Sequence, residues 1–139
     1  MDGSRFLDVA RELVRGRSEA HWRSAAGRAY YALMLEGREA LHRWGFVAPP
    51  RDQVHSFVRL RFSFASDGDL KQVGRALEEL GKLRNQADYQ LAAGPRFSSP
   101  GKALQALQDA EDHLQLLKLI DADLPRRTAV ITDIRAKFP

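Results

Sequence analysis

The sequence predicts an all-α fold, an up-and-down bundle of five or six helices that forms one domain over residues 1–139. Apolar residues recur three and four positions apart in successive segments, which is the spacing of an amphipathic helix. No segment shows the two-residue alternation of a β-strand, and there is no internal repeat. Clusters of glycine, proline, serine and aspartate separate the helical segments, and none is long enough to act as a linker. A single helical bundle is the architecture that these observations favour.

The first two helices are expected over residues 4–15 and 18–44. The first carries apolar residues at helical spacing, namely Phe6, Val9, Ala10, Leu13 and Val14. Ser18 can cap the second helix, and Gly45 and the pair Pro49-Pro50 end it. Its inner stripe consists of Trp22, Ala26, Ala29, Leu33 and Ala40. Alanine at so many inner positions implies that a neighbouring helix approaches closely.

Four further helices are expected toward the C-terminus. Asp52 is expected to cap a third helix that continues through Phe64, and a fourth runs over residues 70–92. Ser98-Ser99-Pro100 is expected to begin a fifth helix, whose apolar face contains Leu104, Leu107, Ala110, Leu114, Leu117 and Ile120. A sixth helix follows Pro125 and carries Val130, Ile131, Ile134 and Phe138. Some glycines fall inside these helices, where they permit close packing: Gly27, Gly37, Gly74 and Gly81.

The composition excludes several classes of protein. The chain has no cysteine, so disulfides, thiolate nucleophiles and cysteine metal sites are excluded, and a cytoplasmic location is expected. Acidic residues and arginines interrupt every apolar run near the N-terminus, which is unlike a signal peptide, and no stretch is long enough to span a membrane. The four histidines share no ligand spacing, so neither a metal nor another cofactor is expected.

The charge of the chain is unevenly distributed. The net charge is +4, and 17 of the 22 basic residues are arginine. Residues 1–66 carry 11 basic and 7 acidic residues, so the excess lies in the first half. A basic surface favours an anionic partner such as nucleic acid. A GC-rich genome also enriches proteins in arginine, so composition alone leaves both explanations open.

The most informative residue is Arg84, because it occupies a core position of the fourth helix. Apolar residues there are separated alternately by three and four positions, with Arg84 within the series Leu70, Val73, Leu77, Leu80, Arg84, Ala87 and Leu91. An arginine buried without a partner is costly, so a partner or water must reach it. Asp88 lies four residues further on, at the spacing of an intrahelical ion pair.

The second helix offers polar residues for the same place. Ser24, Arg28 and Tyr31 are four and three positions apart and therefore share one side of that helix. Beside Arg84 they would form a positive pocket suited to phosphate, because the guanidinium fork matches phosphate oxygens. The alternative is that Arg84 and Asp88 only fix the register of packed helices, with the neighbouring tyrosines as core aromatics.

Two segments, taken in order, resemble the HEPN superfamily. They are residues 24–32, SAAGRAYYA, and residues 83–89, LRNQADY. They are similar to a branch of small prokaryotic HEPN proteins with an R-A-Y-Y helix and a later R-x-x-A-D-Y motif. His55 stands where that branch often has a histidine at the start of its third helix. The resemblance covers roughly residues 18–91.

The resemblance implies a helical bundle that forms homodimers, with arginine motifs of two subunits meeting across a cleft. It also implies metal-independent RNA cleavage, in which an R-x4-6-H motif supplies an arginine for the phosphate and a histidine for proton transfer. Many members are toxins of toxin–antitoxin pairs, often encoded beside a small nucleotidyltransferase, or belong to phage-defence systems. The candidate catalytic residues are then Arg84, Asp88 and Tyr89, and the candidate binding residues are Arg28, Tyr31, Asn85 and His55.

The sequence departs from the R-x4-6-H motif. Tyr89 stands five residues after Arg84 and Gln90 six residues after it, so the usual histidine is missing. A phenol, whose ordinary pKa is about 10, is a poor base near neutral pH. His55 is the histidine that could take its place. We therefore expect a protein that binds RNA or nucleotide phosphate, either an RNase or a degenerate relative. The competing hypothesis is a non-catalytic helical module that binds a partner protein such as a nucleotidyltransferase.

Overall fold

The computed structural model describes residues 1–92 and 94–139, and its secondary structure is helical. Over these residues it contains six α-helices: α1 (Arg5–Val14), α2 (Glu19–Arg43), α3 (Gln53–Ser63), α4 (Gly68–Tyr89), α5 (Gly101–Ala122) and α6 (Leu124–Lys137). A short 3-10 helix, η1 (Gly94–Phe97), precedes α5 and was not expected from the sequence. The predicted all-α bundle is confirmed. No helix in the described part is long and apolar enough to cross a lipid bilayer.

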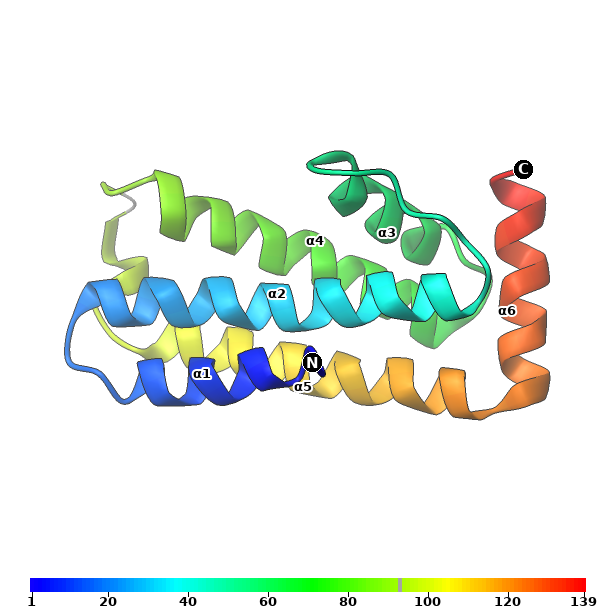
Figure 1. Ribbon diagram of the computed structural model, residues 1–139. Coiled ribbons are helices and arrows are strands. Elements are labelled where there is room, and N and C mark those ends of the chain that lie inside the picture. Colours follow the sequence, from blue (N-terminus) through cyan, green and yellow to red (C-terminus); the bar gives the residue numbers. More distant parts are fainter. Residues whose placement is uncertain (93) are drawn as a thin grey trace.

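The long helix α2 lies at the centre of the bundle and packs against α1, α4 and α5. α2 runs in the direction opposite to α1 and α4 and in the same direction as α5, and α3 packs on α4 beside the second half of α2 (Figure 1). The last helix, α6, crosses the end of the bundle instead of running along it (Figure 1). One wall of the bundle is therefore formed by α2, α3 and α4 together.

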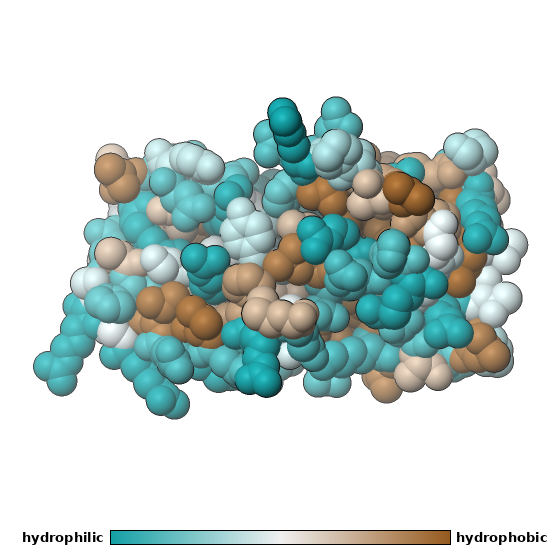
Figure 2. Space-filling view, viewed as in Figure 1, coloured by the Kyte–Doolittle hydropathy of each residue, from teal (hydrophilic) through white to brown (hydrophobic). Residues whose placement is uncertain are grey.

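The core follows the predicted apolar stripes. Alanines 26, 29, 32 and 40 of α2 are fully buried, as small side chains at a close helix contact should be. The inner faces of the other helices contribute the largest buried side chains, among them Phe62, Phe97, Leu70 and Ile120. Hydrophobic residues on the face shown in Figure 2 form separate patches among hydrophilic ones. Three residues of the expected apolar faces, Val9, Leu91 and Leu104, are instead exposed.

The exposure of Leu91 has a clear cause at the end of α4. The helix ends at Tyr89, earlier than expected. The Arg23 side chain of α2 donates hydrogen bonds to the backbone carbonyls at this end. Its Nη1 atom donates to the carbonyls of Gln86, Ala87 and Gln90 at 2.9–3.1 Å, and Nη2 donates to that of Leu91 at 3.1 Å. The last carbonyls of a helix have no partner within the helix, and the buried guanidinium supplies one.

The helix caps agree with the sequence at some ends only. The Ser18 side chain accepts a hydrogen bond from the His21 amide, as expected for the start of α2. The expectation for Asp52 was wrong, because its backbone is helical and its carboxylate makes no capping bond to α3. The expected serine cap of α5 was also wrong, because Pro100 occupies the capping position and the Ser98 hydroxyl donates to the Pro95 carbonyl.

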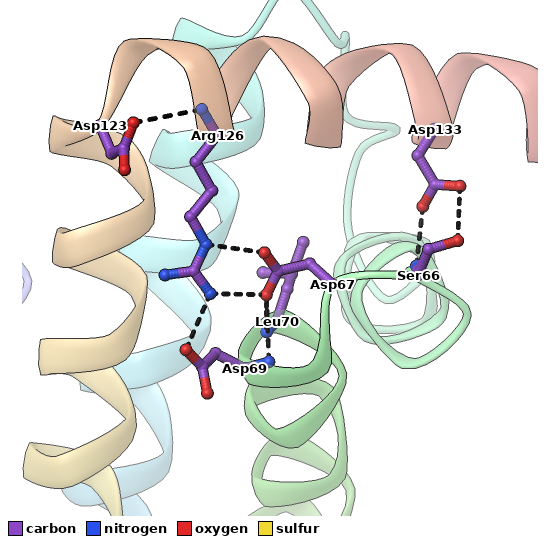
Figure 3. Close-up of polar contacts among 7 residues, drawn as sticks. All are labelled: Ser66, Asp67, Asp69, Leu70, Asp123, Arg126 and Asp133. Carbon is purple, nitrogen blue, oxygen red and sulfur yellow. Dashed lines mark hydrogen bonds and ion pairs between the residues drawn. The ribbon is translucent and has the colours of Figure 1, made fainter.

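Polar contacts hold α6 against the start of α4 (Figure 3). Arg126 donates from Nε to Asp67 at 2.7 Å and from Nη2 to Asp67 and Asp69 at 2.8 and 2.7 Å. Asp67 also caps α4 by accepting from the amides of Asp69 and Leu70. The Arg126 guanidinium holds the pKa of the Asp67 carboxyl below its ordinary value of 3.8. A second contact joins Asp133 of α6 to the amide and hydroxyl of Ser66.

Candidate functional site

A cleft of about 540 Å³ opens between α2, α3 and α4. Five of its lining residues are sequence candidates, namely Tyr31, His55, Arg84, Asn85 and Tyr89. The remaining lining residues are Tyr30, Asp52, Ser56, Arg59, Leu77, Glu78, Gly81 and Lys82. The cleft therefore brings together side chains from all three helices that the HEPN resemblance covers.

Arg84 lies on the α4 wall with its guanidinium at the cleft. Its side chain is 20% exposed, so it is half-buried and open to a ligand rather than enclosed among leucines. The Nη2 atom donates to the hydroxyl of Tyr31 at 2.7 Å, and Nη1 donates to Asn85 Oδ1 at 3.3 Å. The guanidinium carbon lies 5.2 Å from the ring centre of Tyr31 and 5.6 Å from that of Tyr89, which favours a cation.

The expected ion pair between Arg84 and Asp88 is confirmed. Nε of Arg84 lies 3.0 Å from Oδ2 of Asp88. This nitrogen is buried and has no hydrogen bond of acceptable geometry, so the contact is electrostatic and poorly aligned. Because Asp88 holds the Nε edge only, it neutralises the arginine in part and leaves the outer edge to other acceptors.

His55 meets Tyr30 on the other side of the cleft. Nδ1 of His55 lies 2.5 Å from the Tyr30 hydroxyl, and the two rings are nearly parallel, with 12° between their planes. The Tyr31 ring stands edge-on to both. Within the described part of the chain, Nε2 of His55 makes no hydrogen bond. His55 of α3 thus lies in the same cleft as Arg84, beside the Tyr31 ring whose hydroxyl Arg84 contacts.

The cleft keeps both members of this pair neutral near pH 7. Burial raises the pKa of the Tyr30 hydroxyl to about 12. Burial lowers the pKa of His55 below its ordinary value of 6.5, the charge of Arg84 lowers it further, and Asp52 opposes the change. An uncharged histidine can act as a hydrogen-bond donor or a proton acceptor, whereas a charged one can only donate.

The residues that line the cleft carry a small positive formal charge. They include three cations, Arg59, Lys82 and Arg84, and two carboxylates, Asp52 and Glu78, while Asp88 balances part of the Arg84 charge from outside the lining. Lys82 is drawn toward the acidic residues of its own helix, at 3.8 Å from Glu78 and 3.4 Å from Glu79. Because that pairing is exposed, it is weak, and Lys82 adds to the positive charge that Arg59 and Arg84 bring to the cleft.

Two sequence candidates, Arg28 and Asp88, lie beside the cleft rather than in it. Arg28 is exposed and lines a small adjoining hollow of about 120 Å³, together with Ser24, Gly27, Tyr31 and Asp88. The expectation that Arg28 would line the same cleft as Arg84 was wrong, because its guanidinium lies over the Phe6 ring, at 5.7 Å. Tyr31 is the residue that the cleft and the hollow share.

Sequence reasoning missed several residues of the site. Arg59 lines the cleft but belongs to no recognisable motif, so nothing in the sequence distinguishes it from other polar residues of α3. Asp52 also lines the cleft, but it was interpreted only as a helix cap. The buried arginine of α2 is Arg23, one and a half helical turns before the expected Arg28. The sequence did contain one signal for Arg23, which is its four-residue spacing from Glu19. The two side chains form an ion pair at 3.1 Å.

The arrangement provides a forked cation, two tyrosine hydroxyls and a neutral histidine in one cleft, which suits a phosphate group rather than a metal ion. Within residues 1–92 and 94–139, no three His, Asp or Glu side chains are grouped so that they could hold a metal ion. Comparisons with protein-family models, curated proteins and solved structures find no match to the chain.

Proposed function

We propose that this protein binds single-stranded RNA through the cleft between α2, α3 and α4, as an HEPN-like protein, and that it cleaves the bound strand without a metal. The observation that carries the proposal is the convergence of Arg84 and His55 on the Tyr30–Tyr31 pair. The resemblance of residues 24–32 and 83–89 to HEPN motifs supplies the choice of RNA.

A phosphodiester fits the chemistry around Arg84. Nε of the guanidinium pairs with Asp88, and its two outer nitrogens donate hydrogen bonds to the neutral oxygens of Tyr31 and Asn85. A phosphate oxygen is a stronger acceptor than either neutral group, so it can take over one of these hydrogen bonds at little cost. The exposed ring of Tyr89, at the rim, offers a flat surface on which a base can stack.

His55 supplies the group for proton transfer. Cleavage joins the 2′-oxygen of the ribose to the phosphorus as the bond to the 5′-oxygen breaks. The 2′-oxygen loses its proton to water, and the 5′-oxygen takes one from Nε2 of protonated His55, which then recovers a proton from water. A histidine with an ordinary or lowered pKa can exchange protons near neutral pH, which Tyr89 cannot. Arg84 would stabilise the charge that develops on the phosphate oxygens.

The test is binding and cleavage of a fluorescent single-stranded RNA by the full chain. Arg84→Ala should weaken binding roughly 10- to 100-fold, the equivalent of a lost charge-assisted contact, and should abolish cleavage. Arg75→Ala is the matched control, because Arg75 is exposed on the same helix and does not line the cleft. A salt titration should show a binding slope that Arg84→Ala reduces by about 0.7, the value for one phosphate contact on a single strand.

The outcomes separate the hypotheses. Unchanged RNA binding and cleavage in Arg84→Ala would overturn the proposal. RNA binding without cleavage would identify a degenerate relative. If the wild-type chain binds no RNA but co-purifies with a defined protein, the interaction module is the correct interpretation.

The proposal also includes a homodimer and a place in a toxin–antitoxin or phage-defence system, both taken from the HEPN resemblance. Light scattering measures the mass of the particle in solution, and a monomer at micromolar concentration would contradict the dimer. Expression in cells should arrest growth with the wild-type chain and not with Arg84→Ala. Co-expression of a neighbouring nucleotidyltransferase should relieve that arrest.

A further inference from the structure

Tyr30 is the tyrosine of the cleft whose hydroxyl contacts a histidine. The residue is 6% exposed and sits on α2 with its ring edge against Gly81 of α4. An added Cβ at Gly81 would meet the Tyr30 ring at 3.4 Å, an ordinary van der Waals distance, so α2 and α4 lie close together at this point. Its hydroxyl contacts His55 Nδ1 at 2.5 Å.

The chemistry of the two groups decides which one donates. A phenol is a far stronger acid than the N–H of a neutral imidazole, and an imidazole nitrogen is a far better acceptor than a phenol oxygen. In the neutral pair the Tyr30 hydroxyl therefore donates and His55 Nδ1 accepts. When one ring nitrogen of a neutral histidine accepts a hydrogen bond, the other must carry the hydrogen. That nitrogen is Nε2.

We propose that Tyr30 is a positioning residue, which holds neutral His55 with its hydrogen on Nε2 and so presents an N–H donor, rather than a lone pair, to an anionic oxygen bound beside Arg84. The identity of the anion as an RNA phosphate rests on the proposed function, whereas the position of the hydrogen does not. The hydrogen of Nε2 and the outer nitrogens of Arg84 then provide donors from two helices for one phosphate.

The opposite arrangement would make a different site. If Nδ1 carried the hydrogen and donated to Tyr30, Nε2 would carry a lone pair on a side chain that lines the cleft. A lone pair repels a phosphate oxygen, and His55 would then suit proton removal rather than anion binding. The two arrangements differ by one hydrogen position, which can be measured in the free protein.

The measurement is a histidine ¹⁵N NMR spectrum of the full chain above pH 7. Long-range couplings between ring protons and ring nitrogens distinguish a protonated nitrogen from an accepting one. The chain has four histidines, and the His55→Gln variant identifies the signals of His55 by their loss. Two isosteric variants are compared, Tyr30→Phe and Tyr31→Phe, of which the second removes only the hydroxyl that Arg84 contacts.

We expect one tautomer in the wild type, with hydrogen on Nε2, and the same spectrum for His55 in Tyr31→Phe. Tyr30→Phe should give averaged shifts, as for a histidine that exchanges between both tautomers. Hydrogen on Nδ1 in the wild type would overturn the proposal, as would an unchanged His55 spectrum in Tyr30→Phe. Circular dichroism of each variant checks that the helices remain folded.

Binding of a 2′-O-methyl RNA, which cannot be cleaved through its 2′-oxygen, tests the role in recognition. Tyr30→Phe and His55→Ala should each weaken binding about 3- to 10-fold, and the double variant should be no weaker than His55→Ala alone, because Tyr30 acts through His55. Additive losses would overturn the positioning role. If the wild type binds no RNA, the proposed function fails while the NMR spectrum still decides the position of the hydrogen.

Discussion

Nη2 of Arg84 donates a hydrogen bond of 2.7 Å to the hydroxyl of Tyr31, which joins α4 to α2 across the cleft. This contact explains why a polar residue occupies a core position on each of two packed helices. Each side chain keeps its apolar stem against the core and satisfies its polar end with the other. Tyr31 follows Tyr30 in the chain, so the residue that Arg84 contacts is next to the one that contacts His55.

The pH dependence of His55 follows from its surroundings. We expect a pKa below 6.5 in the folded protein, because burial and Arg84 both disfavour the protonated form. The histidine therefore contributes to stability above pH 6.5, and that contribution is lost as the pH falls through the lowered pKa. NMR titration measures it, and Arg84→Met should raise the pKa of His55. A pKa of His55 above 6.5 in the wild type would contradict the buried, arginine-facing environment.

The contact between α6 and α4 should stabilise the fold. Asp67→Ala removes both the helix cap and the ion pair with Arg126, and should lower the free energy of unfolding by about 1–3 kcal/mol. Asp67→Asn keeps a capping oxygen and loses only the charge, so its effect should be smaller. Denaturant unfolding of the two variants measures both.

The same ion pair should give the protein an acid-sensitive component of stability. Because the folded pKa of Asp67 is lowered, its contribution is present above the ordinary value of 3.8 and is lost as the pH falls through the lowered pKa. The wild type should lose more unfolding free energy over this range than Asp67→Asn does. Equal losses would show that the carboxylate is not stabilised in the fold.

The two arginines Arg23 and Arg28, five positions apart on α2, should behave differently. Arg23→Met leaves the carbonyls at the end of α4 without a donor, and should cost about 1.5–3 kcal/mol of unfolding free energy. Arg28→Met affects an exposed side chain, and should change stability by less than about 0.5 kcal/mol. Thermal and denaturant unfolding give both values. Comparable effects would contradict the assignment of Arg23 as the buried partner of α4.

Close packing between α3 and α4 depends on Gly74. An added Cβ there would lie 2.4 Å from the backbone nitrogen of Ser63, so Gly74→Ala forces the two helices apart. We expect a loss of about 1–3 kcal/mol, typical of overpacking. Gly68→Ala is the control on the same helix, since no atom lies within 4 Å of an added Cβ, and its stability should be equal or higher by up to about 1 kcal/mol.

The sequence predicts the parts of this structure that depend on local spacing. The helices and the Arg84–Asp88 ion pair follow from three- and four-residue intervals, because these are properties of one helix. Leu91 shows where such a pattern stops being informative. It continues the apolar series, yet it is exposed, because α4 ends at Tyr89 before that position is reached.

The parts that depend on how helices meet could not be predicted. The hydrogen bond between Tyr30 and His55 requires the register of α2 against α3, which no spacing within either helix reveals. Arg23 and Arg28 are likewise hard to tell apart in the sequence, since both border the apolar stripe of α2. Only the position of the end of α4 decides that Arg23 is the buried one.

Helix α4, which carries Arg84, is secured at both of its ends. Arg126 holds its first turn through Asp67, and Arg23 holds its last carbonyls. The backbone on which Arg84 stands is therefore ordered during folding, before any ligand arrives. Such preorganisation reduces the conformational entropy lost on binding, so even a few contacts in the cleft can give useful affinity.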